Sequence, residues 1–308
     1  MEKANKTLVT EFLLVGFDGG PGLRVSVFTA VLLIFAVALS GNVTMMVMIC
    51  INLRLHSPMY FFLWNLSLIE TLNILNIAPL ILVQTFSLHF SVSKSACFMQ
   101  SFLFYYLGTN VFFLLPIMSY DRYVAICNPL RYTTIMTSML CMKLVIASWI
   151  GSFILMLCPL ILTTKIIFCG ANIIDHFFCD GLSILKLACT DTWLLQVYNV
   201  TVSLFLLPSS LGYMVVSYTI VISSVLRIPS TSGRRKAFST CSSHLTMVAI
   251  VYGCAIAVEV SPMLKPSARA YKTVSVVTPL ISPLMNPFVY TFSNERVKEV
   301  LKKRMETC

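Results

Sequence analysis

The placement of charged residues constrains this chain more than any other feature. Each of seven runs without Asp, Glu, Lys or Arg is long enough for the ~20 residues that a helix needs to cross a bilayer. Hydrophobic residues make up 57% of the 308 residues and charged residues only 11%, which is more apolar surface than a soluble core of this size can bury. We therefore predict an integral membrane protein whose spans contain the runs 25–53, 71–93, 95–120, 144–164, 192–226, 237–258 and 273–294.

The second span begins before its charge-free run. Pro58 suits the first position of a helix, and residues 58–69 are apolar, so this span carries the acid Glu70 inside it. We predict an all-α membrane protein, a bundle of seven transmembrane helices. Residues 1–23 form an extracellular tail, and residues 293–308 form a cytoplasmic tail with a short amphipathic helix. The seven-helix transmembrane domain covers residues 24–292, and its predicted spans are about 24–51, 58–86, 96–124, 140–164, 194–226, 237–261 and 271–292.

Basic residues near the span ends predict the orientation. With the N-terminus outside, 13 Lys and Arg residues lie on the cytoplasmic side and 9 on the outer side. The glycosylation sequon at Asn5 fits an exposed N-terminal tail, and the net charge of +10 fits an anionic inner leaflet. We expect a multi-pass protein of the plasma membrane with an extracellular N-terminus.

Cysteine placement agrees with this orientation. Cys97, Cys169, Cys179 and Cys189 all fall on the proposed outer side, where an oxidising compartment permits disulfides. Four cysteines allow three pairings, and the residues alone do not choose among them.

Four short motifs occur in order along the chain. PMYFFL opens the second span at Pro58, and SYDRYVAICNPLRY closes the third span from Ser119 to Tyr132. KAFSTCSSHL opens the sixth span at Lys236, and PLMNPFVY ends the seventh from Pro283. Together, at this spacing, they resemble the odorant (olfactory) receptors of vertebrates, which are rhodopsin-like G-protein-coupled receptors. The resemblance runs from the N-terminal tail to the last helix.

The resemblance implies a signalling role for the cytoplasmic ends of the spans. Arg122 would be held by Asp121 at rest and released toward a G protein when the sixth span moves, and an always-charged guanidinium suits such a switch. The simpler interpretation is an interfacial ion pair. The expected coupling residues are Asp121, Arg122, Tyr123, Tyr218, His244, Asn286, Pro287 and Tyr290. The resemblance also favours the disulfides Cys97–Cys179 and Cys169–Cys189.

Asn42, Glu70 and Asn286 are polar residues deep in apolar spans. Such residues should face the bundle interior, where they either fix helix packing or form a sodium- or water-linked group that changes on activation. Many odorant receptors carry a second acid in the third span where this chain has Val111, and Ala where it has Pro116. This departure weakens the expectation that Glu70 binds sodium.

A ligand pocket is expected between the outer halves of the third, fifth, sixth and seventh spans. Most of the candidate lining residues are apolar or aromatic, which suits a small volatile ligand. Glu259 is the unusual member: it either pairs at the outer rim with Lys265, Arg269 or Lys272, or faces the cavity and favours an amine or another hydrogen-bond donor. The candidates are Phe104, Tyr105, Gly108, Thr109, Val202, Ser203, Leu206, Tyr252, Ile256, Glu259, Val276 and Leu280.

The resemblance implies an odorant receptor that activates a stimulatory, olfactory-type G protein and raises cyclic AMP. A receptor for a non-odorant small amine or metabolite is the nearest alternative, and a transporter would need more intramembrane ionisable groups or repeats. The sequence holds no serine–histidine–acid set, phosphate loop or zinc-ligand cluster, so we expect no catalysis, cofactor or metal. Its basic clusters lack interleaved aromatic residues, so we expect no nucleic-acid partner.

Overall fold

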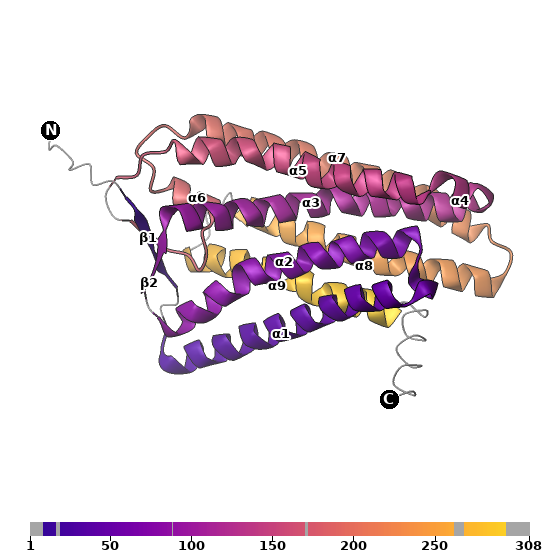
Figure 1. The fold of residues 1–308 in the computed structure, drawn as a ribbon, viewed down its shortest axis with the longest axis horizontal. Coiled ribbons are helices and arrows are strands. Elements are labelled where there is room, and N and C mark those ends of the chain that lie inside the picture. The colour runs from indigo at the N-terminus through magenta and orange to yellow at the C-terminus, as the bar shows by residue number, and fades with distance from the viewer. Residues whose placement is uncertain (1–8, 17–18, 88, 170–171, 262–267, 294–308) are drawn as a thin grey trace.

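The computed structural model describes residues 9–16, 19–87, 89–169, 172–261 and 268–293. Within these residues, seven long helices lie side by side along the length of the molecule (Figure 1), as the sequence predicted. Short elements join them at the two ends: the 3-10 turns Leu53–Leu55 and Pro129–Arg131 and the helices α4 (Tyr132–Ile135) and α6 (Gly181–Leu185). The long helices are α1 (Pro21–Ile51), α2 (Pro58–Phe86), α3 (Lys94–Cys127), α5 (Ser138–Thr164), α7 (Trp193–Leu226), α8 (Thr231–Val260) and α9 (Ala268–Ser293).

Local sequence explains where several helices begin. Pro58 occupies the first turn of α2, where its missing N–H is not needed. The hydroxyl oxygen of Ser93 accepts a hydrogen bond from the backbone N–H of Ala96 at the start of α3, and Thr137 caps α5 in the same way. Such caps satisfy backbone donors that have no partner within the helix.

α8 departs most from its predicted range. It begins at Thr231, whereas the predicted span begins at residue 237. Ser230 caps the helix by accepting from the backbone N–H of Gly233 at 3.2 Å, and the exposed Arg234 and Arg235 lie in its first turns. Charged residues are compatible with a helix, so a gap in charge predicts the apolar part of a helix but not its ends.

Among the described residues, six stretches are long and apolar enough to cross a membrane: α1, α2, α3, α5, α7 and the part of α8 from Cys241 to Val260. α9 falls outside this set because three prolines, Pro279, Pro283 and Pro287, and several polar residues dilute its apolar side chains. It packs against α1, α2 and α8 and completes the bundle as the seventh helix.

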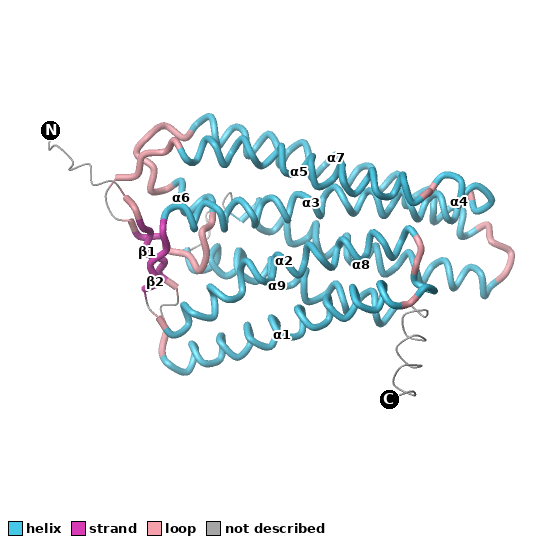
Figure 2. The backbone as a smooth tube through the Cα atoms, in the orientation of Figure 1, coloured by secondary structure: helices cyan, strands magenta, loops and turns pink. Residues whose placement is uncertain are grey.

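A three-stranded sheet covers the end of the bundle nearest the N-terminus (Figure 2), and the sequence analysis did not predict it. β1 (Glu11–Val15) pairs antiparallel with β2 (His89–Ser93) and parallel with β3 (Ile173–Ile174). Phe12 and Leu14 are fully buried in a cluster beneath the sheet. Part of the predicted N-terminal tail is therefore a strand that is packed onto the bundle.

The largest core cluster joins side chains from all seven long helices toward the end of the bundle that carries α4. One close approach there depends on a glycine. A Cβ atom at Gly41 of α1 would lie 2.7 Å from the ring of Pro287 on α9, so a larger residue at this position would push the two helices apart. This contact helps to place α9 against α1.

Candidate functional site

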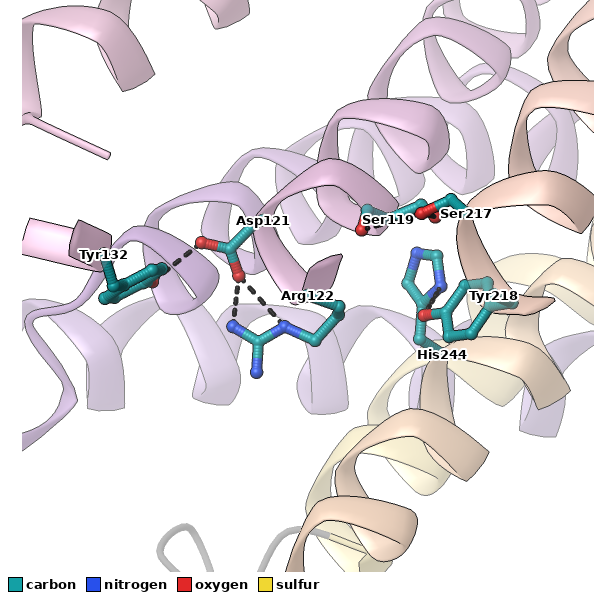
Figure 3. Close-up of polar contacts among 7 residues, drawn as sticks. All are labelled: Ser119, Asp121, Arg122, Tyr132, Ser217, Tyr218 and His244. Carbon is teal, nitrogen blue, oxygen red and sulfur yellow. Dashed lines mark hydrogen bonds and ion pairs between the residues drawn. The ribbon is translucent and has the colours of Figure 1, made fainter. Parts of the chain in front are cut away.

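The acid–base pair of the third predicted span lies at the α4 end of α3 (Figure 3). Arg122 donates to Asp121 Oδ2 through Nε at 2.9 Å and also through Nη2. The hydroxyl of Tyr132 on α4 donates to Asp121 Oδ1 at 2.7 Å. Burial and Asp121 raise the pKa of Tyr132 above its ordinary value, so its hydroxyl stays a donor. Both oxygens of the buried Asp121 are thus engaged, and Arg122 is held against α3.

A second polar contact lies beside this pair and joins α7 to α8. The Tyr218 hydroxyl and His244 Nδ1 share a hydrogen bond of 2.7 Å between buried side chains. The hydroxyl of Ser119 donates to that of Ser217 at 3.0 Å and joins α3 to α7. Three helices are therefore connected by polar contacts within a short stretch of the bundle (Figure 3).

Two further predicted coupling residues, Tyr123 and Tyr290, lie near this group. Arg122 interacts electrostatically with the phenols of both Tyr218 and Tyr290. Tyr290 is buried on α9, and its hydroxyl has no hydrogen-bond partner among the described residues. Tyr123 packs against the cluster that contains Tyr218 and Cys241. The structure therefore brings side chains of α3, α7, α8 and α9 together around Arg122.

A buried polar group lies between α1, α2 and α9. Asn286 Nδ2 donates to Asn42 Oδ1 at 2.6 Å and to the hydroxyl of Ser67 at 3.2 Å. Asn42 Nδ2 donates to the carbonyl oxygen of Pro283 at 2.9 Å, so it provides a hydrogen-bond donor for one of the α9 prolines. Asn42 and Asn286 thus hold the two helices together, as their depth in apolar spans predicts.

Glu70 lies deeper in α2 and is only partly satisfied. Its Oε1 accepts from the hydroxyl of Ser282 at 2.5 Å, while Oε2 has no partner among the described residues. The side-chain amide of Asn110 on α3 is also buried without a described partner. Because buried polar atoms need partners, this region suits bridging water. The side chain of Val111, which is buried beside Asn110, has no oxygen that could bind sodium. Sodium binding at Glu70 therefore stays a prediction, and the sequence itself weakens it.

An open space lies inside the half of the bundle nearest the sheet, beside Gly108 on α3. One turn away on each side, Phe104 contacts Phe178 at a ring distance of 5.3 Å and Phe112 contacts Tyr252 at 5.2 Å. This face of α3 therefore points into the bundle. A Cβ atom added at Gly108 would nevertheless meet no described atom within 4 Å outside its own helix backbone. The open space at Gly108 is the candidate ligand cavity.

The predicted lining residues divide into two sets. Val276 and Leu280 of α9 are buried in a cluster with residues of α1 and α2 and with Phe177 and Phe178 of the loop after α5. Phe104 packs against the same cluster, while the remaining candidates lie on α3, α7 and α8: Tyr105, Gly108, Thr109, Val202, Ser203, Leu206, Tyr252, Ile256 and Glu259.

The loop after α5 closes the end of the bundle that carries the sheet. Disulfides join Cys97 to Cys179 and Cys169 to Cys189, the two pairings that the resemblance favours. Gln84 Nε2 of α2 donates to the carbonyl oxygen of Phe177 at 2.5 Å. The loop is thus held to α2 and α3 above the candidate cavity.

Lys272 of α9 also holds this end together, in a role that the sequence analysis did not predict. Its Nζ donates to the carbonyl oxygens of Val15 and Gly16 and to Asp175 Oδ1. Of the three basic residues considered as rim partners of Glu259, Lys272 is thus engaged elsewhere, because three other acceptors surround its ammonium group. Glu259 Oε1 instead accepts from the hydroxyl of Ser203 on α7 at 3.1 Å.

Several other predictions fall outside the described residues. The sequon at Asn5, the amphipathic helix within 293–308 and the residue Lys265 belong to this part of the chain, and the side chain of Arg269 is likewise not described. The sequence analysis missed the contact of Tyr132 with Asp121. It also missed the contact of Ser210 with Tyr252, in which the two hydroxyl oxygens lie 2.7 Å apart. Tyr132 belongs to the motif that contains Arg122, which was the available signal.

Comparison with known proteins agrees with this arrangement. A family described as "Olfactory receptor" matches residues 31–307. Olfactory receptor 6X1 of Homo sapiens is 41% identical over 304 residues, which cover 99% of this chain and 97% of that protein. Olfactory receptor 6E1 of Mus musculus is 39% identical over 303 residues, which cover 98% and 97%. The chain, a multi-pass membrane protein with a seven-helix bundle, therefore belongs to the olfactory receptor family.

Proposed function

We propose that this odorant receptor binds a small, mostly apolar volatile molecule in the space beside Gly108 and activates a stimulatory G protein of the olfactory type, which raises cyclic AMP. The N-terminus and the sheet then face the outside of the plasma membrane, and α4 faces the cytoplasm. The apolar and aromatic lining favours binding by desolvation. Arg122 and its neighbours at the opposite end are the proposed coupling residues.

One observation carries the proposal: a regular seam of hydrogen bonds between α7 and α8 runs from the candidate cavity to Arg122. The pairs are Ser203–Glu259, Ser210–Tyr252 and Tyr218–His244. Moving inward, steps of seven and eight residues on α7 match steps of seven and eight on α8, as antiparallel helices in fixed register require. We call these three pairs the α7–α8 seam.

The α7–α8 seam gives a ligand a physical route to the cytoplasmic end. A ligand beside Tyr252 that binds more tightly when α8 has moved shifts the receptor toward that state by the difference in affinity. Movement of α8 separates His244 from Tyr218 and changes the surroundings of Arg122. The guanidinium is then free to meet the G protein.

The experiment is a cyclic-AMP assay in cells with confirmed surface expression, using a broad panel of volatile molecules. Responses that disappear in Arg122→Ala at equal surface level are expected. A matched control is Arg131→Ala. This variant removes an exposed arginine from the cytoplasmic turn that joins α3 to α4. Silence of the wild type across the volatile panel, together with a response to non-volatile amines or metabolites, would favour the alternative receptor class and contradict the proposal.

A further inference from the structure

The carboxylate of Glu259 lies at the outer end of the α7–α8 seam, on the cavity side of α8. Tyr252, Ile256 and Glu259 follow one another at intervals of four and three residues, which places them on one face of the helix. Tyr252 contacts Phe112 of α3 and Ser210 of α7. Because Glu259 bonds to Ser203 of α7, this face of α8 meets α7 along its length. Tyr252 thus packs one turn from Gly108 through Phe112, and the exposed carboxylate of Glu259 lies about two helical turns farther along α8 toward the sheet.

Three described lysines at this end of the bundle have partners other than Glu259. Lys272 is surrounded by Asp175 and two carbonyl oxygens. Lys186 lies over the ring of Tyr271 at 5.9 Å, and Lys94 lies over the ring of Phe168 at 5.0 Å. Among the described residues, Glu259 forms no ion pair, and the neutral hydroxyl of Ser203 is its hydrogen-bond donor.

Aromatic rings border the same carboxylate. Glu259 interacts electrostatically with the phenols of Tyr105 on α3 and Tyr271 on α9. Tyr105 is 40% exposed although it lies on α3 in the middle of the bundle, so its side chain borders open space. A carboxylate next to tyrosine rings attracts an alkylammonium group through charge and through the negative faces of the rings.

Asp180, the other acid near this carboxylate, already forms hydrogen bonds within the protein. Asp180 Oδ2 accepts from the backbone N–H and the hydroxyl of Ser183 at 3.0 Å and from the hydroxyl of Tyr271 at 3.2 Å. Asp180 therefore caps α6 and fixes Tyr271. Glu259 remains the carboxylate that a ligand in the open space can reach.

We propose that Glu259 makes small primary amines the preferred ligands of this receptor, an inference that rests on the proposed function. The ammonium group donates to the Glu259 carboxylate and competes with the hydroxyl of Ser203, while the hydrocarbon part fills the apolar space beside Gly108. An alcohol of the same shape forms a neutral hydrogen bond only, and a carboxylate ligand is repelled. The ammonium group thus acts on the outermost pair of the α7–α8 seam.

The test compares cyclic-AMP responses to two matched series at neutral pH: the n-alkylamines from butylamine to octylamine and the alcohols with the same chains. In the wild type, the amines should act at lower concentrations than the alcohols. In Glu259→Gln, the amines should lose about tenfold or more in potency, and the alcohols should change by less than about threefold, since charged hydrogen bonds are about twice as strong as neutral ones.

Two further variants separate binding from general effects of charge or folding. Glu11→Gln removes an exposed carboxylate at the same end of the molecule that also accepts from a serine, since the hydroxyl of Ser91 donates to Glu11 Oε2 at 2.6 Å. It should leave both series unchanged. Glu259→Lys should reduce amine potency further and improve the response to hexanoate. Surface staining shows whether each variant reaches the membrane.

The possible outcomes distinguish this inference from the proposed function. If the wild type answers to alcohols but not to amines, or if Glu259→Gln weakens both series equally, the amine preference is wrong and the odorant receptor proposal stands. If the wild type at the cell surface answers to neither series nor to any other volatile, both are wrong. If Glu259→Gln fails to reach the surface, the response of Glu259→Lys to hexanoate decides: a gain supports the site and its absence overturns it.

Discussion

Replacing Lys272 with Met is expected to loosen the outer end of the receptor. The Lys272 ammonium group donates to the carbonyl oxygens of Val15 at 2.8 Å and Gly16 at 2.7 Å and to Asp175 Oδ1 at 2.6 Å. It therefore connects α9 to the end of β1 and to the loop after β3. Methionine keeps an unbranched side chain of similar length but has no donor. The variant should still fold, with these three segments less firmly attached.

The magnitude follows from the exposure of each partner. The side chain of Asp175 is 64% exposed and that of Lys272 is 13% exposed, so the ion pair contributes about 0–1 kcal/mol. Each hydrogen bond from the charged donor to a carbonyl contributes about 1–1.5 kcal/mol, less than usual for a charged donor, because water can replace the donor at this end. Methionine can still pack against the ring of Phe177, which lies 5.0 Å from the ammonium group. The expected loss is therefore the sum of the two carbonyl contacts and the ion pair, about 2–4 kcal/mol.

Thermal unfolding of the detergent-solubilised receptor measures this loss. At about 2 °C for each kcal/mol in a chain of this size, Lys272→Met should lower the midpoint by about 4–8 °C. Asp175→Asn is the matched control, because it removes only the exposed charge and should cost about 2 °C or less. Equal shifts in the two variants would show that the ion pair, not the carbonyl contacts, carries the effect and would refute the reasoning.

Three other predictions concern the cavity, the polar core and pH. Gly108→Val should reach the cell surface normally but lose about tenfold or more in agonist potency, because its methyl groups occupy the proposed ligand space; unchanged concentration–response curves would place the ligand elsewhere. Glu70→Gln should unfold near the wild-type temperature because it keeps an acceptor for Ser282, whereas Glu70→Leu should lose about 1–3 kcal/mol; equal midpoints would contradict this. Burial lowers the pKa of His176, so the unfolded chain takes up the proton first as pH falls below ~6.5, and stability should drop by up to about 1.4 kcal/mol per pH unit. His176→Gln should remove that part of the pH dependence of the unfolding midpoint, and a midpoint that falls equally in both proteins would argue against it.

The bundle was predictable because a lipid bilayer strongly restricts which sequences can cross it. Helices that cross a bilayer must be long and nearly free of charge, so gaps between charges predicted all seven long helices, including α9 with its three prolines. The sheet was not predictable in this way. β1 alternates the buried Phe12 and Leu14 with more exposed neighbours, but a five-residue alternation also occurs in loops. Its partners are far away in the chain, in β2 and β3.

In the candidate site, too, contacts between sequence neighbours were predictable and contacts between distant residues were not. Asp121 and Arg122 are neighbours in sequence, so their pairing followed from the motif. The contact of Tyr132 with Asp121 needs the chain to fold back through α4, and sequence spacing does not specify this. The packing of Val276 and Leu280 against α1, α2 and the loop after α5 was not predictable for a related reason: a position on a helix does not specify the neighbour that its side chain meets.

The α7–α8 seam shows why weak contacts suit a receptor of this kind. Each neutral hydrogen bond contributes about 0.5–1.5 kcal/mol net, so the two inner pairs, Ser210–Tyr252 and Tyr218–His244, together contribute about 1–3 kcal/mol. A ligand changes the population of a state only by its difference in affinity for the two states, and about 1–3 kcal/mol is typical of such coupling. In the proposed mechanism, a seam of this strength holds α8 in place without ligand and is matched by the affinity difference that one small molecule can supply. Buried ion pairs in its place would cost about 3–5 kcal/mol each to break, which exceeds that typical coupling.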